Sequence, residues 1–264
     1  MTPLLTIIIP TYNSINTLCR ALDSILDQTF TDYEILFIDN CSTDGTLDII
    51  KNHASLKDNI RWISEHDKGI FDAMNKGIKL AKGEWIYFLG SDDKLFNSDV
   101  LQLIEHEVSN NNYDVIYGDV YSKRFNGRYF GEFTNSKILK QNICHQAIFF
   151  RKTIFKKLGL FSLKYKSNAD WDHNIRWFLS RSISKKYFSL VVAEYADNGF
   201  SSTYNDAKFK NEKILQFLKY GKNQLSLRIR ARFLKQELAR TANIRNMRLF
   251  FKLVINTPKI LIGI

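Results

Sequence analysis

The chain has 264 residues, and its 45% hydrophobic and 14% aromatic content is enough to bury the core of one large domain. Its three cysteines are far apart and not in Cys-x-x-Cys spacing, which argues against a zinc site or a disulfide framework and favours a reducing compartment. The net charge of +11 is confined to residues 205–264, where 14 Lys or Arg face three acidic residues, so we expect this last quarter to have a task of its own.

Predicted strands and helices alternate in the first hundred residues. Residues 4–9 predict a buried strand that ends at Pro10, and this start has neither the basic segment nor the cleavage site of a signal peptide. The segments that follow are a helix at 14–28, a strand at 34–38, a helix to about residue 51, a strand at 60–64, a helix at 72–81 and a strand that begins at 84. This order predicts an α/β fold with a mostly parallel central sheet flanked by helices.

The rest of the chain has a different character. Residues 115–119 open a section richer in strands, and Asn126-Gly127 is a strong hairpin signal. Long helical stretches with many Lys and Arg begin after Thr203, and no apolar stretch reaches the ~18 residues that cross a bilayer. We therefore expect one domain at 1–204 and a basic, amphipathic helical extension at 205–264.

Two adjacent carboxylates, Asp92 and Asp93, follow the apolar strand that begins at 84. Their mutual repulsion is tolerable where a divalent cation shares them, and such hard oxygen ligands suit Mg²⁺ or Mn²⁺. The pair on its own favours a solvated turn, because Ser-Asp-Asp is a common turn composition.

Polar residues end each of the four predicted strands of this half, at 10–13, 39–45, 65–69 and 91–93. The carboxyl ends of parallel strands meet at one edge of a sheet, so these segments are expected to converge in one cleft. Acidic groups there suit a cation or the hydroxyls of a ribose or a sugar. The chain has no Gly-x-Gly-x-x-Gly after the first strand and no Gly-Lys-Ser/Thr loop, which argues against a dinucleotide site and an NTPase.

An ordered set of motifs carries a family resemblance. The segments are Ile-Ile-Ile-Pro-Thr-Tyr-Asn at 7–13, Ile-Asp-Asn-Cys-Ser-Thr-Asp-Gly at 38–45, residues 65–77, residues 81–93, Cys-His-Gln at 144–146 and Ala-Asp-Trp-Asp at 169–172. With these motifs, residues 4 to about 203 resemble the inverting family 2 glycosyltransferases, which have the GT-A fold for binding nucleotide sugars. The variant Asp-Ala-Met-Asn-Lys-Gly at 72–77 resembles the branch that builds bacterial surface polysaccharides.

The resemblance implies a donor-binding set. Its members are Pro10, Thr11, Tyr12, Asp39, Asp67, Asn75, Lys76 and Asp92. Thr11 and Tyr12 would line the pocket for base and ribose, and Asp39 would accept a hydrogen bond from a base such as uracil. Asp93 would ligate the Mn²⁺ or Mg²⁺ ion that bridges the diphosphate, with His173 completing the metal shell. The family places a further Asp where this chain has Gly90, which affects how many carboxylates hold the metal.

The resemblance also implies a single displacement at the anomeric carbon. Asp170 is the candidate base that removes the proton of the acceptor hydroxyl, and His145 and Trp171 are candidates for contact with the acceptor or the diphosphate. Structural alternatives exist for each: an acid in the first turn of a helix for Asp170, a structural imidazole for either histidine, and a core position for Trp171.

The basic extension mixes Arg and Lys with Leu, Ile and Phe at helical spacing, as in helices that lie in an anionic membrane interface. Together these features predict an enzyme that transfers a sugar from a UDP-sugar to a lipid-linked oligosaccharide for capsule, O-antigen or exopolysaccharide. It would work on the cytoplasmic face of the bacterial membrane as a peripheral protein, without nucleic acid. A helical lid on the catalytic domain is the alternative for the extension. A nucleotidyltransferase and a non-catalytic, membrane-associated nucleotide- or sugar-binding subunit are the alternative functions.

Overall fold

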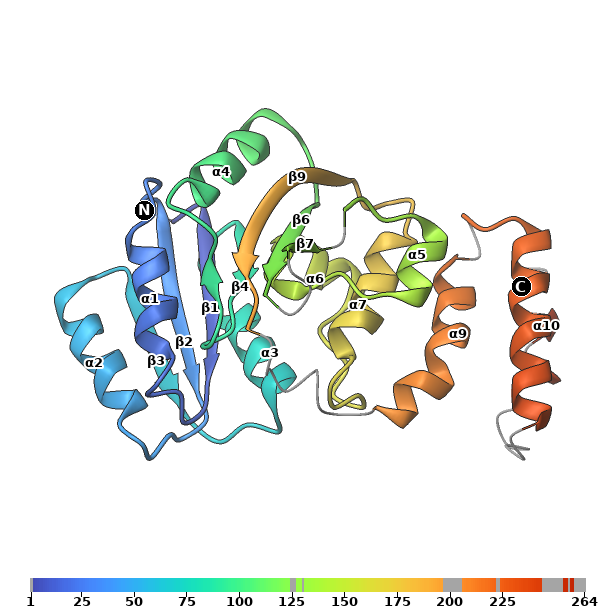
Figure 1. Ribbon diagram of the computed structural model, residues 1–264, viewed down its shortest axis with the longest axis horizontal. Coiled ribbons are helices and arrows are strands. Elements are labelled where there is room, and N and C mark those ends of the chain that lie inside the picture. Colours follow the sequence, from blue (N-terminus) through green and yellow to red (C-terminus); the bar gives the residue numbers. More distant parts are fainter. Residues whose placement is uncertain are drawn as a thin grey trace.

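The computed structural model describes residues 2–123, 127–129, 131–196, 206–221, 224–243, 254–255 and 257–258 (Figure 1). The strands are β1 (Leu5–Thr11), β2 (Tyr33–Asp39), β3 (Ile60–Ser64), β4 (Trp85–Phe88), β5 (Lys94–Leu95), β6 (Val115–Ser122), β7 (Gly127–Tyr129), β8 (Ile148–Arg151) and β9 (Lys185–Glu194). The helices are α1 (Leu18–Leu26), α2 (Thr46–Leu56), α3 (Ile70–Leu80), α4 (Val100–Asn110), α5 (Asn135–Lys140), α6 (Thr153–Leu158), α7 (Ala169–Phe178), α9 (Ala207–Gly221) and α10 (Leu227–Asn243), with a short 3₁₀ helix η1 (His145–Ala147).

The described strands form one sheet in the order β3-β2-β1-β4-β8-β6-β9-β5, with β7 on the edge of β6. The first four of these are parallel, as the alternation of strands and helices predicts. Their registers place Thr11 beside Asp39, and Asp39 beside Ser64. The polar strand ends therefore lie along one edge of the sheet, as expected.

The second half of the sheet is mixed. β8 is antiparallel to both β4 and β6, whereas β9 runs parallel to β6. The prediction of a mostly parallel sheet thus holds for the N-terminal half only. β7 pairs antiparallel with β6, with Gly127 opposite Ser122, as the hairpin signal predicts; residue 126 lies outside the described residues.

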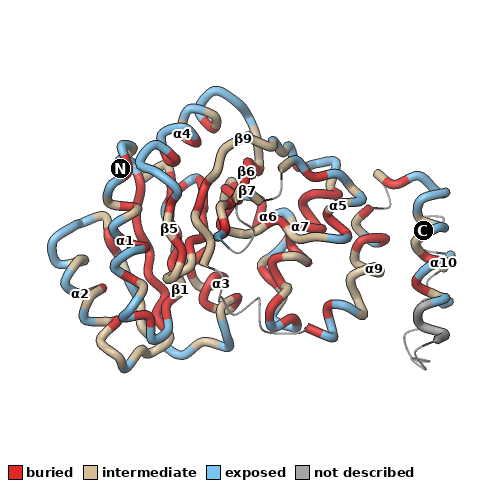
Figure 2. The backbone as a smooth tube through the Cα atoms, in the orientation of Figure 1, coloured by how far each residue is buried: buried red, intermediate tan, exposed pale blue. Residues whose placement is uncertain are grey.

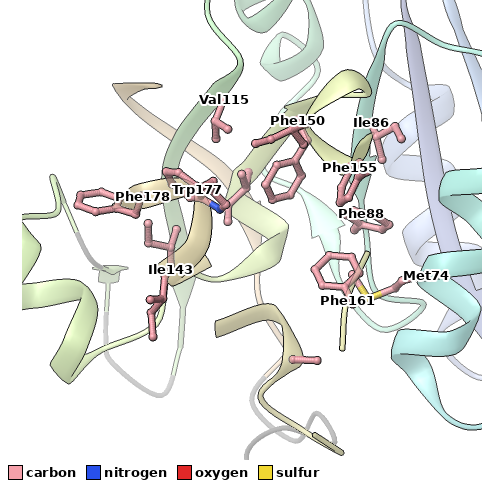
Figure 3. Packing of buried hydrophobic residues seen from close by; sticks show 14 of the residues in the cluster. Met74, Ile86, Phe88, Val115, Ile143, Phe150, Phe155, Phe161, Trp177 and Phe178 are labelled. Atoms are coloured by element: carbon pink, nitrogen blue, oxygen red, sulfur yellow. The ribbon is translucent and has the colours of Figure 1, made fainter. Parts of the chain in front are cut away.

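Two hydrophobic clusters cover the two faces of the sheet because successive side chains of a strand point to opposite faces. In β1, Ile8 packs with Met74 of α3, whereas Ile7 and Ile9 pack with Leu22 of α1. The cluster that contains Ile8 and Met74, which we call the α3 cluster, continues into the second half of the molecule. There Phe88, Phe150, Phe155, Phe161 and Trp177 interleave (Figure 3).

The extension begins as part of this core. Phe209 and Phe217 of α9 are buried in the α3 cluster, whereas α10 packs on α9 mainly through Leu234 and Leu218. α10 lies at the edge of the molecule beyond α9, and most of its residues from 227 to 239 are exposed (Figure 2). Among the described residues, no helix is long and apolar enough to cross a membrane. After residue 243, only residues 254–255 and 257–258 of the extension are described.

Candidate active site

Asp39 stands at the centre of the predicted donor edge and is fully buried. Its carboxylate accepts hydrogen bonds from Thr11 Oγ1 at 3.3 Å, from Ser64 Oγ at 2.6 Å, and from the backbone N–H and the hydroxyl of Ser42 at 3.0 and 2.5 Å. These four donors join β1, β2, β3 and the loop after β2 through one side chain. They also occupy the acceptor positions of the carboxylate, so contact between Asp39 and a nucleotide base stays a prediction.

Tyr12 lies beside this centre and is the most accessible member of the predicted donor set, with 62% of its surface exposed. The next residue, Asn13, has a left-handed backbone conformation, and its side-chain oxygen accepts a bond from the N–H of Thr43 at 3.0 Å. The loop after β1 is therefore tied to the loop after β2, and the Tyr12 ring faces solvent, where it is available to stack on a base. Pro10, in β1, is half-buried.

Asp67 and Lys76 also reach this edge. The backbone N–H of Asp67 donates to Asn40 Oδ1 at 2.9 Å, and burial raises the pKa of the Asp67 carboxyl. The Nζ of Lys76 lies 2.9 Å from Glu65 Oε1 and 2.6 Å from the carbonyl oxygen of His66. The Lys76 ammonium thus holds the loop that carries Asp67, and contact of either residue with a donor stays a prediction.

Asn75 has a different position from the one expected. It is buried, its Nδ2 donates to the carbonyl oxygen of Phe161 at 2.9 Å, and its Oδ1 accepts from the N–H of Phe161 at 3.0 Å. Both ends of the amide are therefore used to fix the chain at Phe161. The structure assigns Asn75 to the core and corrects its expected role in donor binding.

The two carboxylates that follow β4, Asp92 and Asp93, differ in how far they are buried. Asp92 is half-buried, whereas Asp93 is 1% exposed. The Asp93 carboxylate accepts a hydrogen bond from Gln146 Nε2 at 2.6 Å and one from the backbone N–H of Ala196 at 2.8 Å. Burial and the neighbouring Asp92 carboxylate raise the pKa of Asp93 to about 6. A cation shared by the pair would offset both effects.

Gly90 explains how the two carboxylates are accommodated. A Cβ atom at this position would collide with Asp93 Oδ2 and lie 2.9 Å from Asp92 Oδ1. The aspartate that the family pattern places here would therefore not fit this arrangement of the pair. No group of three or more His, Cys, Asp or Glu side chains suited to a metal exists among the described residues. Two carboxylates still fit Mg²⁺ or Mn²⁺, because such ions take their remaining ligands from substrate phosphates and water.

His173 does not belong to this acidic edge. Its ring is fully buried and lies against Phe150, Phe155 and Phe161, with centroid distances of 5.0–5.7 Å. Its Nε2 lies 3.2 Å from the carbonyl oxygen of Gly159. Burial holds the pKa of His173 well below its usual value. The expectation that His173 completes a metal shell is therefore wrong, since the ring belongs to the aromatic core.

Asp170, the candidate base, lies in the first turn of α7. Its Oδ2 accepts a hydrogen bond from Asn142 Nδ2 at 2.7 Å, and its Oδ1 accepts one from the backbone N–H of Trp171 at 2.8 Å. His145 Nδ1 lies 3.7 Å from Asp170 Oδ2. The structure thus brings together the residues at 145 and 170, which the sequence analysis placed on the acceptor side.

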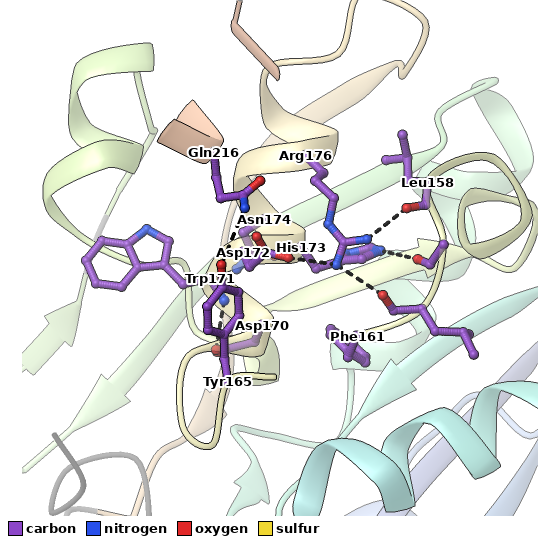
Figure 4. A network of polar contacts seen from close by, with 12 residues as sticks. Leu158, Phe161, Tyr165, Asp170, Trp171, Asp172, His173, Asn174, Arg176 and Gln216 are labelled. Carbon is purple, nitrogen blue, oxygen red and sulfur yellow. Dashed lines mark hydrogen bonds and ion pairs between the residues drawn. The ribbon is translucent and has the colours of Figure 1, made fainter. Parts of the chain in front are cut away.

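Trp171 turns away from this group. Its Nε1 donates to the carbonyl oxygen of Ile138 at 2.7 Å, Phe209 packs against its ring, and the Lys213 ammonium lies 4.1 Å from the ring centroid. Figure 4 shows Trp171 and Asp170 extending in different directions from α7. The structure therefore assigns Trp171 to the junction of α5, α7 and α9, and its contact with the acceptor or diphosphate stays a prediction.

The match to known proteins decides the family. A family model described as glycosyl transferase family 2 matches residues 6–188. The chain belongs to this family. A Mycobacterium tuberculosis protein named PGL/p-HBAD biosynthesis glycosyltransferase is 42% identical over 215 residues, which span 78% of this chain and 82% of that protein.

Solved structures support the same fold for this glycosyltransferase. Staphylococcus aureus TarS 1–349 in complex with UDP-GlcNAc has a TM-score of 0.73 at 19% identity, covering 97% of this chain and 81% of that one. The Pyrobaculum calidifontis mannosyltransferase PcManGT, in complex with GDP-Man and Mn²⁺, has a TM-score of 0.59 at 16% identity, covering 83% and 63%. The expected GT-A fold is confirmed.

The geometry of this glycosyltransferase adds residues that the sequence analysis did not single out. Gln146 binds Asp93 and Asn142 binds Asp170. Gln146 was visible in the Cys-His-Gln motif, but its partner is 53 positions earlier in the chain. The N–H of Ala196 had no sequence signal, because any residue other than proline offers a backbone N–H.

Proposed function

We propose that this glycosyltransferase moves a hexosyl or N-acetylhexosaminyl group from a nucleotide sugar, in the first place a UDP-sugar, to a hydroxyl of a lipid-linked saccharide, with inversion at the anomeric carbon. One observation carries the proposal. The short segment 142–146 supplies a hydrogen-bond donor to each of two carboxylates, from Asn142 to Asp170 and from Gln146 to Asp93. One segment thus holds Asp93, which we assign to the donor side, and Asp170, which we assign to the acceptor side.

In this proposal, different residues accept the proton, orient the substrate and hold the metal during the single displacement. Asp170 accepts the proton of the attacking hydroxyl at its carboxylate, whose orientation is fixed by bonds to both oxygens. His145 Nδ1 lies 3.7 Å from Asp170 Oδ2, and in this proposal it orients the same hydroxyl or a diphosphate oxygen. Asp92 and Asp93 would hold Mn²⁺ or Mg²⁺, which, when bound, stabilises the charge that develops on the leaving nucleoside diphosphate.

The choice of donor rests on the edge around Asp39 and on related structures. TarS has been solved with UDP-GlcNAc and with UDP, and PcManGT with GDP-Man and Mn²⁺. The exposed ring of Tyr12 provides a stacking surface for a base, and Asp67 and Asp92 provide acceptors for ribose or sugar hydroxyls. We infer that UDP is the first nucleotide to test and that GDP is the second.

The choice of acceptor rests on the relatives and on α10. The names of relatives refer to PGL/p-HBAD biosynthesis in Mycobacterium tuberculosis and to putative teichuronic acid biosynthesis in Bacillus subtilis, which supports a role in cell-surface glycans. On α10, Leu227 and Ile229 are exposed beside the exposed Arg228 and Arg232. Exposed aliphatic and cationic groups on one helix suit an anionic membrane surface. A peripheral position on the cytoplasmic face would bring the active site to a lipid-linked acceptor.

Calorimetric titration with UDP, with and without Mn²⁺, tests the donor site. We expect metal-dependent binding by the wild type, loss of the metal dependence in Asp93→Ala, and unchanged binding in Asp170→Asn. Release of UDP from a panel of UDP-hexoses and UDP-N-acetylhexosamines would then identify the donor sugar. Failure to bind UDP, GDP and dTDP would overturn the proposed donor site. Metal-dependent binding with no transfer to any lipid-linked acceptor would favour a non-catalytic binding subunit.

A further inference from the structure

A chain of side-chain hydrogen bonds leads from the core of α7 to the candidate base. Trp177 Nε1 donates to Asn174 Oδ1 at 2.8 Å, Asn174 Nδ2 donates to Asn142 Oδ1 at 2.9 Å, and Asn142 Nδ2 donates to Asp170 Oδ2 at 2.7 Å. Trp177 is fully buried and Asn174 is 1% exposed. Asn174 Nδ2 also donates to the carbonyl oxygen of Ile143 at 2.9 Å, which fixes the segment that carries Asn142.

The direction of this chain is set at its buried end. An indole nitrogen only donates, so Asn174 must turn its oxygen toward Trp177 and its NH₂ group toward Asn142. The carbonyl oxygen of Ile143 only accepts, which demands the same orientation. Asn142 must then turn its oxygen toward Asn174 and its NH₂ group toward Asp170. No amide in the chain can rotate by 180° without placing oxygen against oxygen or N–H against N–H.

We propose that Asn142 and Asn174 are positioning residues that, through this one-way chain, hold Asp170 as a hydrogen-bond acceptor with a fixed orientation. This inference rests on the proposed role of Asp170 as the base. An NH₂ group at Oδ2 and a backbone N–H at Oδ1 leave the remaining lone pairs of the carboxylate to receive a hydroxyl proton. Because Asn174 and Trp177 lie in the core, the orientation of the base is set by residues beyond the reach of substrate.

The spacing along α7 makes the arrangement possible. Asp170 and Asn174 are four residues apart, and Asn174 and Trp177 are three apart, so all three lie on one side of the helix. Figure 4 shows Asp170 and Asn174 on successive turns of α7. Asn142, in the segment between α5 and η1, spans the turn between them and binds both.

An NMR experiment tests the coupling without any substrate. The chain has four tryptophans, so four indole N–H signals are expected, and Trp177→Phe assigns that of Trp177. We expect Asp170→Asn to shift the Trp177 signal in the wild type and to shift it much less in an Asn142→Ala background, where the chain is cut. An equal shift in both backgrounds would overturn the proposal, because it would show an effect through space or along α7. The Trp85 signal, from β4, serves as the internal control.

Steady-state kinetics with the donor sugar found in the UDP-sugar screen test the consequence for catalysis. Asn174→Asp keeps the shape of the side chain but removes the NH₂ group, so two carboxylates compete for the one NH₂ group of Asn142 and the orientation of Asp170 is no longer fixed. We expect kcat to fall by ~10²-fold, the scale of a misplaced catalytic group, with UDP affinity and donor KM unchanged. Trp177→Phe, which removes the orienting N–H together with part of the buried ring, is expected to have a smaller effect of the same kind.

Controls separate this inference from the function on which it rests. Gln28→Leu removes a buried amide that binds Ser24, Asn97 and Leu101 and none of the site residues, so it should lower stability without lowering kcat. If Asp170→Asn keeps full activity, the proposed base is wrong whatever the other variants do. If Asp170→Asn is inactive while Asn174→Asp keeps wild-type kcat, the base stands and the positioning chain is overturned.

Discussion

Gly90 shows how a single residue determines the form of the acidic site. The carboxylates of Asp92 and Asp93 fold over its Cα, and the space that a Cβ would need is already occupied by their oxygens. The family resemblance implies an aspartate at this position, which would supply a further metal ligand. In the structure, the missing side chain is what allows the pair to lie close together.

Substitution of Gly90 by Ala should therefore disturb the pair. The new methyl group has to displace both carboxylates, and overpacking of this kind costs about 1–3 kcal/mol. We expect Gly90→Ala to weaken Mn²⁺-dependent UDP binding by roughly 10- to 100-fold in calorimetry. Unchanged affinity, with an unfolding temperature equal to that of the wild type, would show that the pair does not hold the metal in this arrangement.

His173 illustrates the opposite case, a titratable residue whose position is structural. Its Nε2 faces a carbonyl oxygen, so this nitrogen carries the proton, and Nδ1 has no hydrogen-bond partner among the described residues. Burial disfavours the charged imidazolium and lowers the pKa of His173 far below the value in an unfolded chain. The folded protein therefore keeps this ring neutral at pH values where the unfolded chain binds a proton.

This difference predicts a pH dependence of stability. Above about pH 6.5 the imidazole is neutral in both states, and as the pH falls below that value only the unfolded state gains a proton, so stability is lost. We expect His173→Met to remove about 1.4 kcal/mol of the loss in unfolding free energy between pH 7.5 and 5.5. Urea unfolding of both proteins at the two pH values measures this. Equal pH dependence in wild type and variant would contradict a buried neutral histidine.

At the scale of elements, one short connection joins the two halves of the molecule. The chain from Leu158, the last residue of α6, to Phe161 is held by side chains of both α3 and α7. Arg176 donates to the carbonyl oxygens of Leu158 at 2.8 Å and Leu160 at 3.0 Å, and Figure 4 shows its guanidinium reaching toward them. Asn75 binds Phe161 from the opposite side. α7, which carries Asp170, is thereby fixed relative to the parallel strands.

Asn75→Leu tests the structural role of this connection. Both the N–H and the carbonyl of Phe161 would lose their buried partner, at about 1–3 kcal/mol each. We expect the unfolding free energy in urea to fall by about 2–4 kcal/mol, while UDP affinity stays at the wild-type level. Reduced UDP affinity with unchanged stability would restore the expectation that Asn75 binds the donor.

The helices and strands also show which structural features a local sequence pattern can predict. Strands 60–64 and 34–38 and the helix at 72–81 were predicted to within about two residues of β3, β2 and α3, because their apolar periodicity is local. The antiparallel placement of β8 between β4 and β6 was not predicted. Strand order depends on which distant surfaces bury each other, and no short segment contains that information.

At the scale of the whole molecule, the charged extension has two parts with different surroundings. α9 contributes Phe209 and Phe217 to the central core, so this part stabilises the fold of the catalytic domain. α10 touches the rest mainly through α9 and exposes Leu227, Ile229, Arg228 and Arg232. The two helices of the extension can therefore have different roles, one as a helical lid and the other as a membrane-binding helix. We propose the first role for α9 and the second for α10.

Charge reversal on α10 tests the membrane proposal. Each basic residue near an anionic surface contributes about 1 kcal/mol, and reversal adds repulsion to that loss. We expect Arg228→Glu/Arg232→Glu to reduce binding to vesicles containing phosphatidylglycerol by at least ~10-fold. The matched control is Lys57→Glu/Lys79→Glu, which makes the same charge change at two exposed positions, one directly after α2 and one in α3. Equal effects of the two pairs would indicate a response to net charge and not to α10.

The sequence by itself determined the α/β class, the parallel N-terminal half, the polar edge at the strand ends and the family, because local periodicity and ordered motifs carry all of these. Only the tertiary structure decided which polar residues pack in the core and which partners they bind. It placed Asn75, His173 and Trp171 in packing roles, and it joined Asn142 to Asp170 and Gln146 to Asp93. A side chain binds a ligand or supports the core according to the neighbours that folding brings to it, and those neighbours come from distant parts of the chain.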